Sequence, residues 1–199
     1  VVLGSIYGGI ATPTEAAAVG ATFAFVLAFL FGELDRKKFL AIITSTVRTT
    51  SMIFLILIAA NVMSMVLAYY NVPALMRELA AGLGKTQVVV LLSIMYLILG
   101  MFFDAISMMI LTLPFVMPMI ETAGLDPIWF GVVLVVLIEA GLLTPPVGLN
   151  LFVIQGSTGA DLSRVIAGSL PFVCLQLLMI VILYVFPQLA LWLPQLTVR

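Results

Sequence analysis

Long apolar stretches, separated by short polar segments, dominate the pattern of this chain. Each is about 17–25 residues long or longer, which is the length that a helix needs to cross the hydrocarbon core of a bilayer. They cover residues 1–32, 49–70, 86–120, 127–154 and 170–186. The pattern therefore predicts an all-α polytopic integral membrane protein.

The first stretch is interrupted once, at residues 8–15, and the helix that restarts there has clear start signals. Thr12 can cap the helix, Pro13 suits its first position, and Glu15 stands three residues after the cap. This spacing defines a capping box, in which the cap and the acid satisfy each other's backbone N–H groups. We expect a mainly structural role for Glu15, at a cap that helps to shape a site.

Polar segments predict which parts of the chain lie outside the hydrocarbon. Residues 33–38 hold the densest charge cluster and must lie in water or among lipid headgroups. Residues 38–48 fit an interfacial arm, because their charges flank apolar side chains. Residues 72–83 fit a short surface helix, and residues 156–164 fit a polar connection before the last span. Trp192 fits an interfacial anchor.

Lysine and arginine predict the orientation, because they favour the cytoplasmic side of a membrane. If residues 33–48 lie on one side, residues 156–168 lie there too, and residues 72–85 and the C-terminus lie opposite. The first side then holds Arg36, Lys37, Lys38, Arg48 and Arg164. The second side holds Arg77, Lys85 and Arg199. We therefore expect the first side to be cytoplasmic.

Residues 86–120 are apolar apart from Asp104 and a few hydroxyl groups. A single helix of that length would overshoot the bilayer, so a bend is predicted near residues 100–107. Two arrangements fit: a pair of spans joined by a turn in water, or a re-entrant hairpin whose tip stays inside the membrane. The apolar tip and the short second arm, residues 108–120, favour the hairpin.

The stretch that follows contains a break, Gly-Leu-Leu-Thr-Pro-Pro-Val-Gly at residues 141–148. An interior proline costs about 3 kcal/mol relative to alanine. Pro145 and Pro146 also cannot donate to the carbonyls of Gly141 and Leu142. In hydrocarbon such a break is tolerated only where protein or a cavity covers it, and secondary transporters bind ions and substrates at discontinuous helices. We therefore expect a binding site here.

Composition narrows the chemistry of that site. The chain is 64% hydrophobic and 9% charged, with a net charge of −1 and a mean hydropathy of +1.32. These values exclude an ordinary soluble domain and give nucleic acid no basic patch. There is no histidine, and Cys174 is the single cysteine, which argues against a zinc enzyme and a disulfide framework. The chain opens at Val1 without a signal peptide, and we expect part of a longer transporter.

Two acidic residues are candidates for function. A carboxylate in the middle of a membrane segment costs about 2.5–3.5 kcal/mol on insertion scales. Asp104 has no lysine or arginine in the apolar core to pair with, so it fits an ion-binding residue, or alternatively an aspartate in a surface loop. Glu139, two residues before the break, either lines an ion or proton path or accepts hydrogen bonds from freed backbone N–H groups.

Oxygen atoms gather at the break. The Thr144 hydroxyl and the carbonyls freed by the prolines form a hard-oxygen cluster, to which Asn150 and Ser107 can add. Oxygen-only ligation suits a hard cation, and Na⁺ fits better than a transition metal. The alternative is a proline kink that a threonine side chain heals. Two prolines flanked by glycines exceed what a kink needs, so we favour an ion site.

Four motifs carry a resemblance to a known family. They are Gly-Gly-Ile-Ala-Thr-Pro-Thr-Glu-Ala-Ala-Ala-Val-Gly at 8–20, Gly-Met-Phe-Phe-Asp-Ala at 100–105, Leu-Asp-Pro-Ile-Trp-Phe-Gly at 125–131 and Gly-Leu-Leu-Thr-Pro-Pro-Val-Gly-Leu-Asn-Leu-Phe at 141–152. In this order the chain resembles the large membrane subunit of TRAP (tripartite ATP-independent periplasmic) transporters. The resemblance implies the C-terminal half of that subunit, which is its second inverted repeat.

The resemblance also implies a function. It is that of a Na⁺-coupled secondary active transporter, not an enzyme, which lies in the inner membrane of a bacterium or archaeon and works by an elevator mechanism. The imported substrates would be organic acids such as C4-dicarboxylates or sialic acid. The partners would be a periplasmic substrate-binding protein and a small four-helix membrane subunit, separate or fused, and Na⁺ would be the coupling ion.

The resemblance implies a division of the chain and a set of site residues. Residues 86–121 would be a re-entrant hairpin and residues 127–157 an unwound transmembrane helix, which together form the transport part. Residues 1–85 would be the first helices and the interfacial arm, and residues 158–199 an amphipathic connection and the final transmembrane helix. The sodium site would comprise Asp104, Ser107, Gly141, Thr144 and Pro145. Substrate binding would involve Asn150 and Thr144, with the helix cap of Thr12, Pro13 and Glu15 near the site.

Other classes remain open at this point. A carrier like a divalent-anion:Na⁺ symporter would share the architecture and work without a binding protein. An ion channel or a scaffold subunit without a site would share the helices alone. Uptake without a binding protein favours the first of these, and ion flow at channel rates favours a channel.

Overall fold

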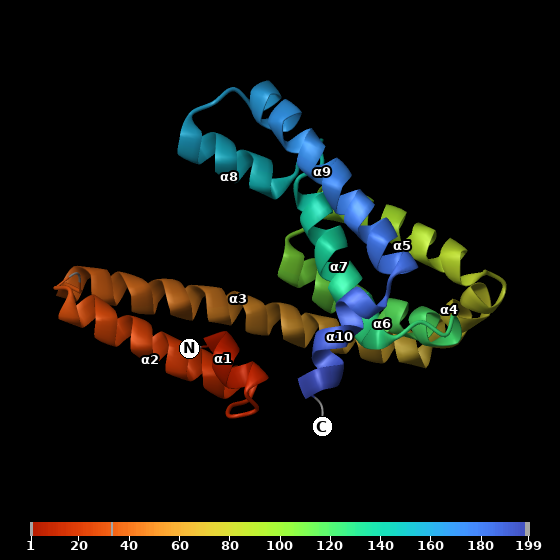
Figure 1. Ribbon diagram of the computed structural model, residues 1–199, viewed down its shortest axis with the longest axis horizontal. Coiled ribbons are helices and arrows are strands. Elements are labelled where there is room, and N and C mark those ends of the chain that lie inside the picture. Colours follow the sequence, from red (N-terminus) through yellow and green to blue (C-terminus); the bar gives the residue numbers. More distant parts are fainter. Residues whose placement is uncertain (1, 33, 198–199) are drawn as a thin grey trace. The chain divides into compact units, whose positions relative to one another are not determined.

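The computed structural model describes residues 2–32 and 34–197, and these residues form helices and short connections without strands (Figure 1). The helices are α1 (Val2–Tyr7), α2 (Pro13–Leu30), α3 (Arg36–Tyr69), α4 (Val72–Ala81), α5 (Lys85–Gly100), α6 (Ala105–Thr122), α7 (Pro127–Leu142), α8 (Leu149–Thr158), α9 (Leu162–Val185) and α10 (Gln188–Thr197). The predicted all-α structure is confirmed. Val1, Glu33 and Arg199, which enter the predictions above, lie outside the described residues.

The length of its apolar helices marks this chain as a multi-pass membrane protein. Among the described helices, α2, α3, α6 and α9 are long and apolar enough to cross a membrane. Helices α5 and α7 are apolar but shorter, with 16 residues each. The chain divides into two compact units, one of residues 1–52 with 192–199 and one of residues 53–191.

In the first unit, α1 packs against α2, and the predicted capping box is confirmed. The Glu15 carboxylate accepts hydrogen bonds from the backbone N–H and the hydroxyl of Thr12, each at 2.8 Å. The Thr12 hydroxyl oxygen in turn accepts the Glu15 N–H at 3.4 Å. Helix α2 therefore begins at Pro13, as the sequence predicts.

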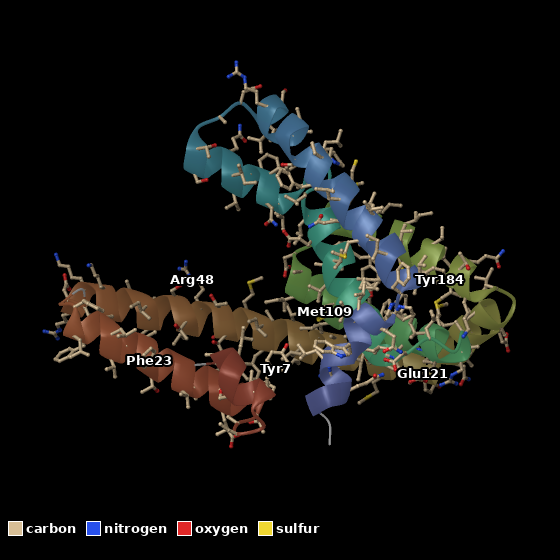
Figure 2. The ribbon with its side chains drawn as sticks, in the orientation of Figure 1. Tyr7, Phe23, Arg48, Met109, Glu121 and Tyr184 are labelled. Atoms are coloured by element: carbon tan, nitrogen blue, oxygen red, sulfur yellow. The ribbon has the colours of Figure 1, made fainter. Side chains whose placement is uncertain are left out.

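One long helix, α3, replaces the two elements expected from residue 38 to residue 70. It runs for 34 residues without a break, and Arg48 projects from it (Figure 2). No glycine or proline lies between residues 36 and 69, so no residue with a poor helix propensity of that kind interrupts the helix there. Lysine and arginine can carry their charges into polar surroundings from a continuous helix. The division into an arm and a separate span is therefore wrong at the level of helix boundaries.

The second unit is built around α7, which is buried along most of its length and contacts both α5 and α9 (Figure 1). The Trp129 indole N–H of α7 donates to the Leu183 carbonyl of α9 at 2.8 Å. The hydroxyl of Tyr184, labelled in Figure 2, lies 2.6 Å from the Thr86 hydroxyl of α5. These bonds hold α5, α7 and α9 together at the end of the unit away from the helix break.

The C-terminal elements differ from the prediction in their boundaries. Helix α8 runs to Thr158 and α9 begins at Leu162, so the polar connection expected at 156–164 is only three residues long. Helix α9 thus starts well before residue 170 and contains Pro171 within its length. A further helix, α10, carries Trp192 and was not predicted, although Pro187 just before it is a helix-start signal.

Candidate functional site

The bend between α5 and α6 lies where the sequence places it, after Gly100 and before Ala105. Asp104 is the N-cap of α6, and its Oδ2 accepts the backbone N–H of Ser107 at 3.0 Å. Ser107 is 9% exposed. The carboxylate therefore has a structural partner, and it sits half-buried at the start of a helix, where the free N–H groups favour a negative charge.

The length of the second arm differs from the expectation. The second arm, α6, has 18 residues and is long enough to cross a membrane, whereas the first arm, α5, has 16. The prediction of a short second arm, which favoured the re-entrant hairpin, is therefore wrong, because the helix begins at Ala105 and extends to Thr122. The apolar turn remains an argument for the hairpin, since Phe102 and Phe103 are both exposed.

Helical structure stops at the predicted break. Helix α7 ends at Leu142, α8 begins at Leu149, and the peptide bond between Pro145 and Pro146 is cis. The Gly141 carbonyl, expected to be free, accepts the Thr144 N–H at 3.0 Å, because a tighter turn replaces the missing α-helical bond.

The Thr144 hydroxyl is also used within the break. It donates to the Ala140 carbonyl at 2.6 Å, as expected for a threonine that heals a proline kink. The hydroxyl oxygen keeps lone pairs after this donation, so it can still ligate a cation. The bond is therefore compatible with both interpretations of the break.

Backbone contacts join the turn before Asp104 to the break. A Cβ atom added to Gly100 would lie 2.6 Å from the Gly141 Cα, and a Cβ atom on Gly141 would lie 2.8 Å from the Gly100 Cα. At the other end of the break, the Gly148 N–H donates to the Met101 carbonyl at 3.1 Å. Both ends of the break therefore touch the residues that lead to Asp104.

An open hollow of about 380 Å³ lies beside the turn. It is lined by Ile56, Ala59, Phe102, Phe103, Asp104, Ser107, Leu111 and Leu149. The structure thus places Asp104 and Ser107 on one hollow, next to the first residue of α8. Among the described residues, no hydrogen bond or ion pair joins either of them directly to Gly141, Thr144 or Pro145.

Glu139 and Asn150 face each other across the break. The Asn150 side-chain amide donates to Glu139 Oε1 at 3.3 Å. The structural interpretation of Glu139 expected its carboxylate to accept hydrogen bonds from freed backbone N–H groups. The carboxylate instead accepts a hydrogen bond from a side chain of α8. This bond links the last turn of α7 to the first turn of α8 and holds the predicted substrate residue Asn150 in place.

If the chain forms part of a Na⁺-coupled importer, as the resemblance implies, Glu139→Gln should keep uptake and its Na⁺ dependence close to those of the unaltered protein. Glutamine retains the acceptor oxygen for Asn150, and a neutral hydrogen bond is weaker than a charged one by only about 1 kcal/mol. Glu139→Leu, which removes the acceptor, should lower uptake more. The measurement is the Na⁺ concentration that gives half-maximal uptake in proteoliposomes. Loss of Na⁺ dependence in Glu139→Gln would instead place Glu139 on the ion path.

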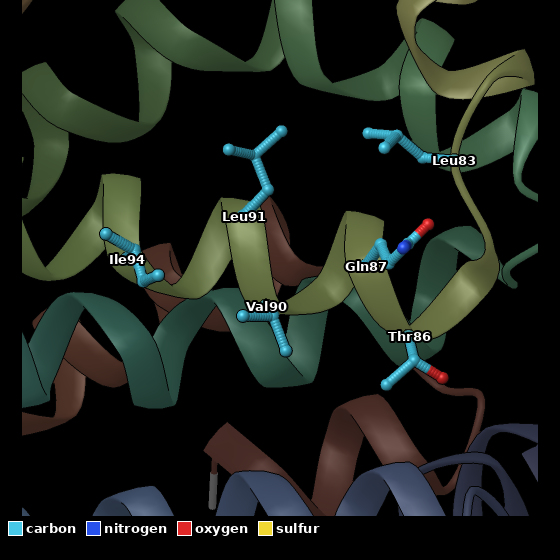
Figure 3. Close-up of a pocket in the computed structure, with 6 residues that line it drawn as sticks. All are labelled: Leu83, Thr86, Gln87, Val90, Leu91 and Ile94. Atoms are coloured by element: carbon cyan, nitrogen blue, oxygen red, sulfur yellow. The ribbon is translucent and has the colours of Figure 1, made fainter.

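The hollow along α5 lacks the chemistry of an ion site. Figure 3 shows the hollow along α5, of about 410 Å³, lined by Leu83, Thr86, Gln87, Val90, Leu91 and Ile94. None of these side chains is charged, and four are aliphatic. We therefore place the candidate site at the turn and the break.

Sequence reasoning missed three residues of this region. Gly100, Met101 and Gly148 act through backbone atoms, and residue type alone does not show which backbone groups will meet. The available signal was the position of the two glycines, since Gly100 opens the motif at 100–105 and Gly148 ends the break at 141–148. The cap residues Thr12, Pro13 and Glu15 belong to the other compact unit.

The comparisons with known proteins agree on one family. Residues 1–189 match the family described as tripartite ATP-independent periplasmic transporter, DctM component. Over 98% of its length the chain is 33% identical to the C4-dicarboxylate TRAP transporter large permease protein of Vibrio cholerae. It is 30% identical over 98% to the sialic acid TRAP transporter large permease protein of that species, and 32% identical over 100% to the ectoine TRAP transporter large permease protein of Halomonas elongata. The matches cover 48%, 47% and 47% of these relatives, so the chain spans about half the length of the curated relatives it matches.

Proposed function

Because the chain belongs to the DctM component family of tripartite ATP-independent periplasmic transporters, we propose that it forms part of a Na⁺-coupled importer of organic acids. Its relatives are named for C4-dicarboxylate, sialic acid and ectoine, so related chains serve several small solutes. The substrate of this chain would be a small carboxylate. Its membrane would be the cytoplasmic membrane of a bacterium or archaeon.

The importer would work with partners. A periplasmic binding protein would deliver the substrate, and a small four-helix membrane subunit, separate or fused, would extend the scaffold. Because the chain spans about half the length of its relatives, the remainder of the substrate site would come from residues outside this sequence. Within the chain, α5 and α6 would form a re-entrant hairpin, and α7 and α8 an unwound transmembrane helix that moves with it as an elevator.

The Na⁺ site would use Asp104 and Ser107 at the turn and Gly141, Thr144 and Pro145 at the break. One observation supports this grouping most directly: the Gly148 N–H of the break bonds to the Met101 carbonyl of the turn, three residues before Asp104. The ligands offered there are carboxylate, hydroxyl and carbonyl oxygens, which suit a hard cation. Thr144 and Asn150 would contact the substrate beside the ion.

We expect uptake by the complete complex to require a Na⁺ gradient. The complex is reconstituted in liposomes and supplied with loaded binding protein, and uptake is followed with an inward Na⁺ gradient and with a K⁺ gradient of the same size. Uptake that is equal under both gradients would refute Na⁺ coupling. Uptake that needs no binding protein would favour a divalent-anion:Na⁺ symporter-like carrier, and ion flow at channel rates would favour a channel.

A further inference from the structure

We infer that Gly100 and Gly148 are positioning residues for the ion site, because their backbone contacts clamp the turn before Asp104 onto the helix break. The inference rests on the proposed Na⁺ site. It concerns two residues that would not touch the ion and that act through Gly141 and Met101.

The first contact of the clamp lies at the ends of α5 and α7. Gly100 is the last residue of α5 and is buried, and Gly141 lies one residue before the end of α7 and is also buried. A Cβ on either glycine would approach the other's Cα within 3 Å, which is closer than carbon atoms pack. The two backbones therefore touch without a side chain between them. This contact fixes the position of the end of α5, from which the turn begins.

The second contact lies at the far end of the break. Gly148 has a φ of +54°, in the left-handed region that favours glycine. Its added Cβ would lie 2.8 Å from Leu151 Cδ1 and 2.9 Å from the Thr144 carbonyl oxygen. In this conformation its N–H points to the Met101 carbonyl at 3.1 Å.

Together the two contacts attach two adjacent residues, Gly100 and Met101, to the two ends of the break. Gly100 meets the end of α7, Met101 meets the start of α8, and Asp104 follows after Phe102 and Phe103. The contacts therefore fix the backbone that leads into the turn, from which Asp104 follows three residues after Met101. Groups that orient ligands in this way typically change metal affinity by about 10–100-fold when they are lost.

The test uses Gly148, because substitutions at Gly100 would separate two packed helices. In Gly148→Ala, the Cβ meets the Thr144 carbonyl, and the N–H should turn away from Met101. In Gly148→Asn, the side chain tolerates positive φ better, which helps the chain to fold while the same contact stays crowded. The matched control is Gly131→Ala in α7, where an added Cβ meets nothing within 4 Å. Uptake by the reconstituted complex is measured against Na⁺ concentration.

Both Gly148 variants should raise the Na⁺ concentration for half-maximal uptake by about tenfold or more. Their maximal rate at saturating Na⁺ should recover, since no ligand is lost, and Gly131→Ala should match the unaltered protein. An unchanged half-maximal Na⁺ concentration in either variant would overturn the inference. So would failure of both variants to accumulate in the membrane, because Gly148 would then serve folding in general. If uptake by the unaltered complex ignores Na⁺, the proposed function fails instead.

Discussion

Replacing Asp104 by asparagine is expected to remove most of the Na⁺ activation of uptake while α6 still begins at the same residue. Asparagine caps a helix about as well as aspartate, so the bond to the Ser107 N–H can persist. What disappears is the negative charge proposed to ligate the ion. We expect the half-maximal Na⁺ concentration to rise by roughly 100-fold or more, since even groups behind the ligands change metal affinity by about 10–100-fold.

Asp126 provides a matched control for this substitution. It is also an N-cap aspartate, and its Oδ1 accepts the N–H groups of Ile128 and Trp129 at the start of α7. Asp126→Asn makes the same chemical change away from the candidate site and should leave Na⁺ dependence unaltered. Equal Na⁺ dependence in Asp104→Asn and the unaltered complex would leave Asp104 with the capping role alone.

Replacing Gly141 by alanine is expected to lower the stability of the protein. The new Cβ would lie 2.8 Å from the Gly100 Cα and 3.0 Å from the Tyr96 carbonyl oxygen, both of which are backbone atoms. Overpacking of this kind costs about 1–3 kcal/mol or more, because the helices must move apart. With about 2–4 °C per kcal/mol for a chain of this size, the apparent Tm should fall by roughly 5 °C or more.

The measurement is the apparent Tm of the purified complex, together with the amount of chain in the membrane. Gly131→Ala, in the same helix but with open space around its Cβ, should not lower the Tm. A Gly141→Ala variant as stable as Gly131→Ala would mean that α5 and α7 do not meet at these glycines.

Local signals explain why several helix boundaries could be predicted from the sequence. The capping box of Thr12 and Glu15 depends on residues three apart, and the structure contains it. The prolines at 145 and 146 lack N–H groups, and helical structure stops just before them. In each case the physical cause lies within one turn of the helix, so the residue types alone carry the information.

The continuity of α3 and the length of α6 show where local signals mislead. Charges near residues 38–48 suggested an arm, but charge does not end a helix that contains no glycine or proline. The second arm of the turn was expected to start near residue 108, yet the Asp104 cap allows α6 to begin at Ala105. Helix length here follows from the cap, whereas Asp104 was considered as an ion-binding residue or as an aspartate in a surface loop.

Two contacts within the candidate site could not be predicted, because they join distant residues. The Asn150 amide donates to Glu139, which lies eleven residues earlier in the sequence, and the Gly148 N–H donates to the carbonyl of Met101, which lies between α5 and α6. Oxygen-rich residues at the break indicated an ion site from composition. The bonds made by Asn150 and Gly148 depend on how α5, α7 and α8 pack, which no single motif specifies.

The meeting of Gly100 and Gly141 has a consequence for the genetics of this protein. When two side chains crowd each other in a core, shrinking one can suppress the harm of enlarging the other. Here each partner is already the smallest residue, so a substitution at position 141 has no intragenic suppressor at position 100, and the reverse holds. Selection for restored growth after Gly141→Ala should return revertants to glycine, and a mutational scan should show two intolerant positions whose effects do not rescue each other.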